Sequence, residues 1–212
     1  MSKKEIILIG GGGHCKSCIE VIESTDDFSI AGIVDMKDKV GSELLGYKII
    51  GSDEDLPVLR EKYDFALVTV GQIKSAGFRK RIFEQLRSLD FQLPVIIAST
   101  ARVSKYASIG QGTIIMHQVF VNANAKIGEN CIINSKALIE HDAAVGDNCH
   151  ISTNSTLNGD VTVGKESFIA SNVAFVNGKT TVGNVIVGIG SVVDKDLTEA
   201  GTYIGHPIRK IK

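Results

Sequence analysis

The stretch VSKYASIGQGTIIMHQVFVNANAKIGENCIINSKALIEHDAAVGDNCHI, residues 103–151, has a large apolar residue at every sixth position. The series continues unbroken to Phe175, and its thirteen members are Val103, Ile109, Ile115, Val121, Ile127, Ile133, Ile139, Val145, Ile151, Leu157, Val163, Ile169 and Phe175. Apolar residues make up 43% of the chain, so chance does not produce such a run. The period slips by about one residue near Thr181 and resumes near Val187.

This six-residue period predicts a solenoid of short parallel strands. It matches neither the 3.6-residue repeat of a helix nor the two-residue repeat of an ordinary strand. Each strand would point one aliphatic side chain inward, and glycine or asparagine at the corners would supply backbone conformations that other residues resist. Three strands would form a coil, and roughly five coils would stack at about 4.8 Å. Cys131 and Cys149 recur among the small residues of the repeat and are expected to pack in its core.

The first hundred residues predict a separate α/β domain. Strand-like runs at 5–10, 30–34, 48–51, 65–71 and 95–97 alternate with helix-like runs after His14, near 53–62 and across 75–89. Such alternation is typical of a small parallel sheet covered by helices. A boundary near 98–102 divides the chain into residues 1–100 and residues 101–212, the coil with its C-terminal tail. The predicted fold class is therefore α/β plus β.

A run of four glycines, residues 10–13, follows the first strand, and Asp35 ends the second. Glycines and an acid at these places are typical of nucleotide-binding sheets. Three interpretations stay open: a dinucleotide fingerprint with Cys15 at its third glycine, a phosphate loop altered at the same residue, and a redox pair of Cys15 with Cys18. Independently of these, the amides of Gly12 and Gly13 at a helix N-terminus are well placed to hold a phosphate.

Composition excludes several other classes. The net charge of −1 gives no electrostatic reason to expect nucleic acid or an anionic membrane as partner. The apolar runs are too short to span a bilayer, and no apolar core of a secretory signal follows the N-terminus. Four unevenly spaced cysteines do not resemble a disulfide framework. We expect a reduced, cytoplasmic protein.

Motifs from both halves together resemble the NeuD/PglD-type sugar O- and N-acetyltransferases. They are the glycine run with His14-Cys15-Lys16, Asp35, Ile139-Glu140-His141-Asp142, and the C-terminal runs 188–193 and 201–207. The resemblance covers essentially the whole chain and implies a Rossmann-like domain that binds a nucleotide sugar, followed by a left-handed parallel β-helix. It also implies acetyl transfer from acetyl-CoA to the amino group of a UDP- or GDP-linked 4-amino sugar in bacterial glycan biosynthesis. Cys15 and residues 71–74 depart from or vary within the family pattern, at positions that bear on the choice of acceptor.

His141 is the candidate base. Acetyl transfer to an amine needs a group that removes a proton, and the ordinary pKa of histidine, about 6.5, suits this role. His141 stands two residues beyond the inward Ile139, so its side chain need not fill the coil. Asp142 follows and can favour the protonated imidazole. The resemblance assigns the base to His141 and its support to Asp142; a solvated pair at a turn is the structural alternative.

The resemblance implies further site residues. His150 would contact the acetyl carbonyl or the coenzyme, with a polar turn residue as the alternative, while Ser171 and Ile189 would lie beside the pantetheine arm. The nucleotide sugar would meet Gly12, Gly13, His14, Asp35 and Met36, and more weakly Gly71 and Lys74. His117 and His206 are expected at the surface. A homotrimer with sites between neighbours is also implied; the coil itself predicts only flat faces and open strand edges that need cover.

Three alternatives remain. An O-acetyltransferase of a sialic-acid-type sugar would need no nucleotide. A β-helix metalloenzyme of carbonic anhydrase type would need three histidines on one zinc, and the pairs formed by His141 with His117 and His150 leave no third ligand. We therefore expect no metal. A purely structural solenoid would need neither the α/β domain nor the pair His141-Asp142.

Overall fold

The computed structural model describes residues 3–206 and 208–211 and divides the chain into two compact units. The first unit comprises Met1–Gly71 and Gly77–Ser99, and the second comprises Gln72–Ala76 and Thr100–Lys212. Sequence analysis assigns residues 72–76 to the first domain, whereas the structure groups them with the coil. The physical reason is Gln72, which forms hydrogen bonds to the coil through both its side chain and its carbonyl oxygen.

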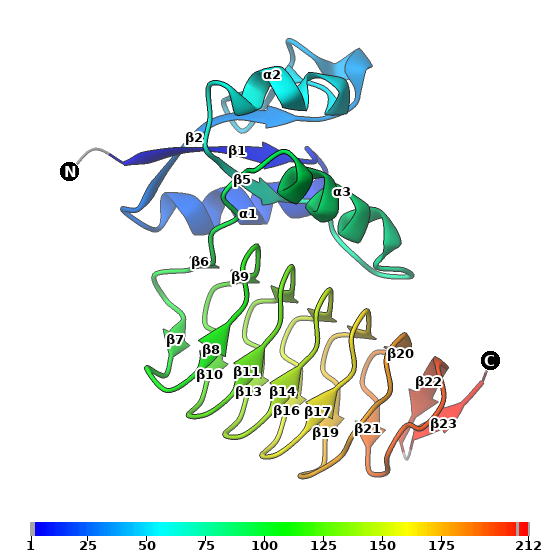
Figure 1. Cartoon of the computed structure of the whole chain (residues 1–212). Helices are drawn as coiled ribbons and strands as arrows, with labels where there is room; N and C mark the ends of the chain where they lie inside the picture. The colour runs from blue at the N-terminus through cyan, green and yellow to red at the C-terminus, as the bar shows by residue number, and fades with distance from the viewer. Residues whose placement is uncertain (1–2, 207, 212) are drawn as a thin grey trace. The chain divides into compact units, whose positions relative to one another are not determined.

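The first unit is a small sheet flanked by helices (Figure 1). Its strands are β1 (Lys4–Ile9), β2 (Phe28–Val34), β3 (Glu43–Leu44), β4 (Tyr47–Gly51) and β5 (Phe65–Val68), in the order β3-β4-β2-β1-β5. All neighbours are parallel except β3 and β4. The helices are α1 (Gly13–Glu23), α2 (Leu56–Arg60) and α3 (Gly77–Ser88), with 3-10 turns at Lys37–Lys39 and Asp53–Asp55, and β6 (Ile96–Ile97) follows.

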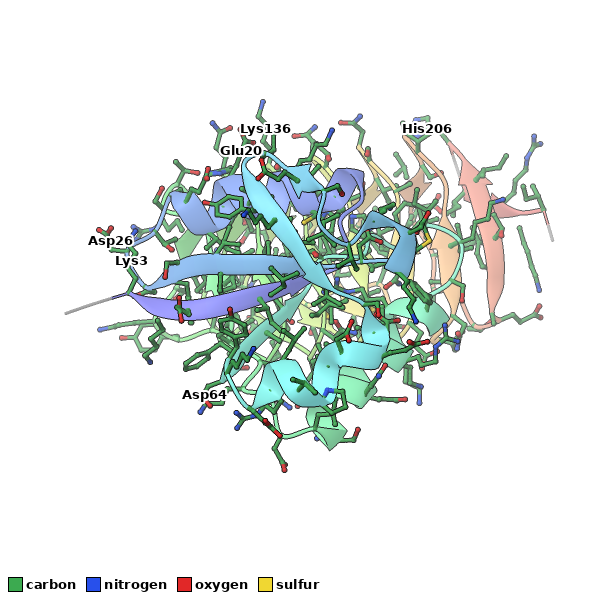
Figure 2. All side chains as sticks on the ribbon, turned by 90° about the horizontal axis from the view of Figure 1, so that it is seen from above. Lys3, Glu20, Asp26, Asp64, Lys136 and His206 are labelled. Atoms are coloured by element: carbon green, nitrogen blue, oxygen red, sulfur yellow. The ribbon has the colours of Figure 1, made fainter. Side chains whose placement is uncertain are left out.

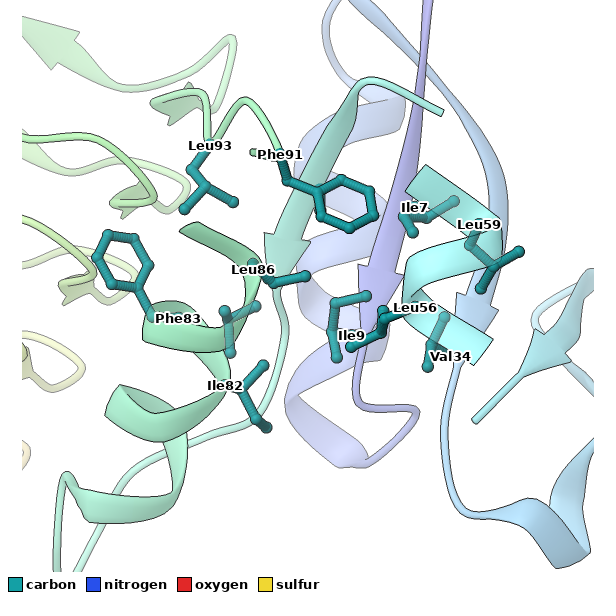
Figure 3. Packing of buried hydrophobic residues seen from close by; sticks show 12 residues of the cluster. Ile7, Ile9, Val34, Leu56, Leu59, Ile82, Phe83, Leu86, Phe91 and Leu93 are labelled. Atoms are coloured by element: carbon teal, nitrogen blue, oxygen red, sulfur yellow. The ribbon is translucent and has the colours of Figure 1, made fainter. Parts of the chain in front are cut away.

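The core of this unit lies on the sheet, where strand residues meet residues of the helices. Ile7 and Ile9 of β1 pack with Leu56 of α2 and Leu86 of α3 (Figure 3). The last four residues of β1 are at most 1% exposed, because a central parallel strand is covered on both faces. Buried Arg79 of α3 donates hydrogen bonds to the carbonyl oxygens of Val68 and Val70. Its guanidinium therefore satisfies backbone acceptors at and just beyond the end of β5. Charged side chains occupy the surface, including the ion pair of Lys3 and Asp26 (Figure 2).

The second unit is a parallel β-helix built mostly of two-residue strands, followed by an antiparallel pair, β22 (Gly201–Gly205) with β23 (Ile208–Lys210) (Figure 1). The first sheet holds β7 (Arg102–Val103), β10 (Phe120–Val121), β13 (Leu138–Ile139), β16 (Thr156–Leu157), β19 (Ala174–Phe175) and β21 (Val192–Val193). The second holds β8 (Ser108–Ile109), β11 (Lys126–Ile127), β14 (Ala144–Val145) and β17 (Thr162–Val163). The third holds β9 (Ile114–Ile115), β12 (Ile132–Ile133), β15 (His150–Ile151), β18 (Phe168–Ile169), β20 (Val185–Val187), β22 (Gly201–Gly205) and β23 (Ile208–Lys210).

The sixth-position series forms the interior of the coil. From Ile115 to Phe175 its members are at most 4% exposed, while Val103 and Ile109 are half-buried on β7 and β8, which end their sheets. Cys131 and Cys149 are fully buried free thiols that donate to backbone oxygens of the next coil, as core packing requires.

The predicted slip of the period near Thr181 is wrong. Thr181 is 6% exposed and stands six residues after Phe175 and six before Val187, so the register is unbroken. The deviation is chemical: a threonine occupies an inward position, and its hydroxyl accepts a hydrogen bond from the Gly164 amide. The polar group is therefore satisfied without a change of register.

Two kinds of corner residue turn the chain. Asparagine, aspartate and a few other residues adopt positive φ at six-residue intervals, among them Asn124 at 60°, Asp142 at 63° and Asn154 at 57°. Glycines such as Gly128 serve a different purpose, because a Cβ there would lie 2.7 Å from the backbone nitrogen of Asp147 in the next coil. Close approach of the coils, rather than positive φ, therefore requires these glycines.

Candidate active site

A pocket of about 310 Å³ lies in the first unit, where the sheet's parallel strands end. Its lining includes Gly10 after β1, Asp35 and Met36 after β2, Ser52 after β4 and Val70 after β5. The carboxyl ends of parallel strands are where open α/β sheets bind ligands. The structure thus places Asp35 and Met36, two residues predicted to bind the nucleotide sugar, in the lining of a pocket at the edge of the sheet where such folds bind ligands.

Asp35 is held by several donors. Its carboxylate accepts hydrogen bonds from the Lys39 amine at 2.9 Å and from the backbone amides of Met36 at 2.8 Å and Gly11 at 3.2 Å. Burial works against the charged form, but these donors outweigh it and lower the pKa of Asp35. The carboxylate is therefore a fixed negative charge, held by Lys39 and by the backbone amides of Met36 and Gly11.

The glycine run leads into α1. Gly12 is the N-cap, with no side-chain cap, and α1 begins at Gly13. Within the described part of the chain the amides of Gly12 and Gly13 donate no hydrogen bond, and a Cβ on either glycine would meet nothing within 4 Å. This exposed helix N-terminus suits an anion. Gly71 lies against His14, whose Cβ would be 3.4 Å from a Cβ at that glycine, whereas Lys74 is an exposed residue of the second unit.

Buried thiols argue against redox chemistry beside this run. Cys15 and Cys18 are fully buried on α1. Burial raises the pKa of Cys15 to about 11 and raises that of Cys18 as well. Because the thiolate is the reactive form, the interpretation of these residues as a redox pair has no support in their surroundings.

His141 and Asp142 stand at an exposed corner of the coil, directly after β13. The imidazole Nδ1 lies 2.8 Å from Asp142 Oδ2. Nδ1 must carry the proton in this bond, which leaves Nε2 of the neutral ring as the free base. The hydrogen bond to Asp142 raises the pKa of His141; slight burial opposes it, and the charges of Asp142, Glu140 and Asp160 add to the rise. The corner therefore carries a base that is stronger than an ordinary histidine.

Asn124, one coil earlier, fixes the other oxygen of the carboxylate. Its amide Nδ2 donates to Asp142 Oδ1 at 2.6 Å, and this bond is the foremost cause of the lowered pKa of Asp142. Asn124 and Asp142 both have positive φ and occupy equivalent corners 18 residues apart. Asn124, Asp142 and His141 thus form a chain of two hydrogen bonds that sequence analysis did not identify.

Gly159 lies one coil beyond His141, at the same corner. A Cβ on Gly159 would be 2.8 Å from Nε2 of His141 and 2.7 Å from its Cε1, closer than real contacts allow. Gly159 is buried, and its φ is not in the positive range. Glycine is therefore needed here to make room for the imidazole rather than to turn the chain.

His150 is buried on β15, with both ring nitrogens engaged. Nδ1 lies 2.6 Å from the carbonyl oxygen of Gln72, so it carries the proton and donates. Nε2 lies 3.2 Å from Asn134 Nδ2, and the oxygen of that amide accepts from the Ser135 backbone. The amide orientation is thereby set, and Nε2 accepts. This network specifies a neutral His150 that holds Gln72, whose side chain also donates to Asn148 O at 2.9 Å.

Ser171 and Ile189 meet at a corner next to β18. They stand 18 residues apart on successive coils, and the amide of Gly190 donates to the carbonyl oxygen of Ser171 at 3.0 Å. The Ser171 hydroxyl lies 3.0 Å from that of Ser152, and the Ile189 side chain is 74% exposed. The structure therefore brings together these two residues, which the resemblance places beside the pantetheine arm of the acetyl donor, and leaves the apolar side chain of Ile189 open to solvent.

Two features bear on the alternatives. Among the residues that the structure describes, no group of three or more His, Cys, Asp or Glu side chains could hold a metal ion. His117 is half-buried, with Nδ1 2.8 Å from the Thr100 hydroxyl, and His206 is exposed. Within the same described ranges, no helix has both the length and the apolar character needed to cross a membrane.

Comparison with known proteins gives matches along both units. Residues 5–86 match the PglD N-terminal domain, and residues 106–141 match the bacterial transferase hexapeptide of six repeats. PerB from Caulobacter crescentus, solved with CoA and GDP-perosamine, is 33% identical over 98% of this chain and 97% of that chain, with a TM-score of 0.91. The chain belongs to the NeuD/PglD-type family of sugar O- and N-acetyltransferases. The family predicted from the sequence and the fold class, α/β followed by a left-handed β-helix, are both confirmed.

Two further family members are similar to this chain. The acetyltransferase domain of PglB from Neisseria gonorrhoeae FA1090, in complex with acetyl coenzyme A, is 29% identical over 99% of this chain and 100% of that chain, with a TM-score of 0.90. A UDP-N-acetylbacillosamine N-acetyltransferase of Bacillus subtilis (strain 168) is 31% identical over 116 residues, 53% of this chain. That match spans 51% of the curated relative, about half of its length.

Proposed function

We propose that this protein transfers an acetyl group from acetyl-CoA to the amino group of a sugar carried by UDP or GDP, as a step in bacterial glycan biosynthesis. The observation that carries the proposal is the corner of the coil at which His141, supported by Asp142 and Asn124, presents Nε2 as a base. The relatives support it, because one was solved with CoA and GDP-perosamine and another with acetyl coenzyme A.

In the proposed reaction the sugar amine attacks the acetyl carbon, a C–N bond forms, and the C–S bond of the thioester breaks. His141 Nε2 takes the proton that the amine loses, and Asp142 stabilises the resulting imidazolium. The leaving sulfur carries the electron pair of the broken bond and becomes the thiol of CoA on protonation. The raised pKa of His141 makes it a stronger proton acceptor and also requires a higher pH to keep it deprotonated.

Asp142→Asn tests the electrostatic part of this proposal. The amide keeps the shape and tolerates the positive φ of residue 142 but carries no charge, so the pKa of His141 should fall toward about 6.5. The acidic limb of the kcat profile should therefore move to lower pH, while maximal kcat declines because the base is weaker. The wild type and Asp142→Asn use the same acceptor amine and the same acetyl donor, so a difference between their pH profiles comes from the protein. An unchanged limb would contradict the role given to Asp142.

Asn124→Gly tests the second hydrogen bond, with Asn154→Gly as its matched control. Both residues have positive φ, which glycine accepts, and both donate to the residue 18 positions later, Asn154 to Asn172 Oδ1 at 2.7 Å. Only Asn124 holds Asp142. We expect kcat to fall between about 3- and 30-fold in Asn124→Gly, less than the roughly 100-fold cost of a 1 Å misplacement. Equal losses of kcat in the two variants would mean that these hydrogen bonds between corner residues of successive coils contribute only to stability.

The donor is proposed to bind along the corner of Ser171 and Ile189. Acetyl-CoA supplies the activated acetyl group; the open side chain of Ile189 and the backbone at Ser171 suit an amphipathic pantetheine arm. The arrangement of His150 changes its proposed part in the reaction. With Nδ1 donating to Gln72 and Nε2 accepting from Asn134, it has no proton free for the thioester oxygen. We propose that His150 positions residues 72–76 beside the donor site.

The acceptor's nucleotide is proposed to bind in the first unit. The fixed carboxylate of Asp35 at the pocket suits ribose hydroxyls, and the helix N-terminus at Gly12 and Gly13 suits the diphosphate. His14, Met36 and Gly71 complete the proposed site, and Lys74 is the weakest member because it belongs to the other unit.

The decisive experiment is a screen of amino sugars linked to UDP and GDP, with acetyl-CoA and thiol release as the readout. Acetylation of one of them, with mass increase on the amine, is expected. Parallel calorimetry with UDP and GDP separates the alternative of an O-acetyltransferase of sialic-acid-type sugars. Absence of nucleotide binding, together with acetylation of a free sialic acid, would overturn the proposal.

We propose a homotrimer formed through the first sheet of the coil. The outward residues of its strands are exposed Arg102 at the end of the sheet and then a half-buried row of low polarity, namely Phe120, Leu138, Thr156, Ala174 and Val192. The second sheet presents Ser108, Lys126, Ala144 and Thr162 instead. An apolar face of this kind on a coil is suited to a second copy. Sedimentation should give about three times the 22.7 kDa of the chain.

The cytoplasm is the proposed location, which the four free, buried cysteines suit.

A further inference from the structure

We propose that Asn177 reads the acceptor sugar, by hydrogen bonding to a hydroxyl next to the amine that His141 deprotonates; this rests on the proposed function. The starting point is the corner stack that contains His141. Gly159 lies one coil beyond His141 and Asn177 lies two coils beyond it, at the same corner. Side chains from residues 36 positions apart in the sequence can therefore meet over the glycine.

The two side chains converge on the space above Gly159. A Cβ placed on Gly159 would lie 2.8 Å from His141 Nε2 and 3.2 Å from Asn177 Nδ2. Both side chains therefore lie against Gly159, and by these two distances the nitrogens of the imidazole and the amide are at most about 6 Å apart. A group that gives its proton to Nε2 lies within hydrogen-bond distance of that nitrogen, so Asn177 lies close to the place of the amine.

The state of Asn177 favours a substrate hydroxyl over the acyl oxygen. Its side chain is exposed, and among the residues that the structure describes it makes no hydrogen bond. Oxyanion stabilisation depends on donors that are held in place before the reaction, which an unrestrained asparagine is not. An amide both donates and accepts, as a hydroxyl does, and can adjust to a bound sugar. Asn177 thus suits recognition in the ground state.

The sugar hydroxyl is identified by its distance from the amine. The amine and a hydroxyl on adjacent ring carbons lie close together, and His141 Nε2 and Asn177 Nδ2 are near enough to each other to contact one of these groups each. The hydroxyl on the carbon adjacent to the amine-bearing carbon therefore fits Asn177 while the amine fits Nε2. The inferred substrate class is an amino sugar with a hydroxyl adjacent to its amine.

The test compares wild type, Asn177→Ala and a Thr162→Ala control, whose exposed residue lies on the second sheet. The acceptors are a nucleotide-linked amino sugar that the wild type accepts and its analogue lacking the adjacent hydroxyl. We expect Asn177→Ala to raise the acceptor KM about 3- to 10-fold with kcat nearly unchanged. The deoxy analogue should cost the wild type a similar factor and cost Asn177→Ala nothing more. Thr162→Ala should match the wild type.

Asn177→Asp adds a readout that a purely structural role would not move. A carboxylate at residue 177, close to the imidazole, would join Asp142, Glu140 and Asp160 and raise the pKa of His141 further, so the acidic limb of kcat should move to higher pH. A kcat loss of 100-fold or more in Asn177→Ala at unchanged KM would overturn the inference in favour of an oxyanion role. Unchanged KM and kcat would overturn it too.

Binding measurements separate this inference from the proposed function. Asn177→Ala should weaken binding of the nucleotide-linked amino sugar and leave binding of the free nucleoside diphosphate unchanged. If the wild type binds the sugar nucleotide but never acetylates it, the proposed function fails while the difference in binding still supports the inference. If the variant binds both ligands as the wild type does, the inference fails while acetylation by the wild type still supports the function.

Discussion

His141→Ala is expected to lower kcat for acetyl transfer by about 10²- to 10⁴-fold while the protein keeps its fold. The side chain is 58% exposed at a corner and fills no part of the coil, so its removal leaves the apolar interior from Ile115 to Phe175 untouched. What is lost is the nitrogen that the chain of Asn124 and Asp142 holds as a base. The measurement is steady-state thiol release, with thermal unfolding as the check on folding.

His117→Ala is the control for this variant, because His117 is another corner histidine whose Nδ1 has a hydroxyl partner and no carboxylate. Its kcat should stay near that of the wild type. Binding of CoA and of the nucleotide sugar should also survive in His141→Ala, since the loss concerns proton transfer. Turnover close to wild type in His141→Ala would remove His141 from the role of base.

The sequence predicts the interior of the coil because the inward residues from Val103 to Phe175 obey one local rule. At Thr181 an inward hydroxyl breaks the apolar pattern but not the register. The sequence also places Asp142 next to His141. It does not state that positive φ at residue 142 turns the carboxylate back to Nδ1, a conformation that aspartate tolerates better than most residues.

Contacts between residues of neighbouring coils are hard to predict from the sequence, although the contacting residues follow the 18-residue spacing of the coils. Subtracting one 18-residue turn from Asp142 gives Asn124, and adding one to His141 gives Gly159, so the repeat itself could have indicated both. No such rule reaches Gln72, which lies 78 residues before His150 and fixes its tautomer. For that reason the sequence predicts a histidine near the donor, whereas the structure gives that histidine two partners and no free proton.

Gly159→Ala is expected to reduce kcat by about 100-fold or more, a loss of the size that misplacing a catalytic group by 1 Å causes. The added Cβ would be 2.8 Å from Nε2 and 2.7 Å from Cε1 of His141, so the imidazole must move. The backbone itself accepts alanine, since φ at residue 159 is not positive. Because the ring is exposed and can swing away, the melting temperature should change little. We therefore expect Gly159→Ala to lose kcat while its melting temperature stays close to that of the wild type.

Two further measurements identify the cause of that loss. Titration of the His141 ring by NMR should show its pKa lower than in the wild type, because the displaced ring loses the hydrogen bond to Asp142 that raises it. If the pKa is unchanged and only the acceptor KM rises, the methyl group excludes the sugar rather than displacing the base. A large fall in melting temperature would instead show that the coil cannot accommodate the methyl group. Wild-type kcat in Gly159→Ala would show that the imidazole keeps its productive position beside the added methyl group, and would contradict the prediction.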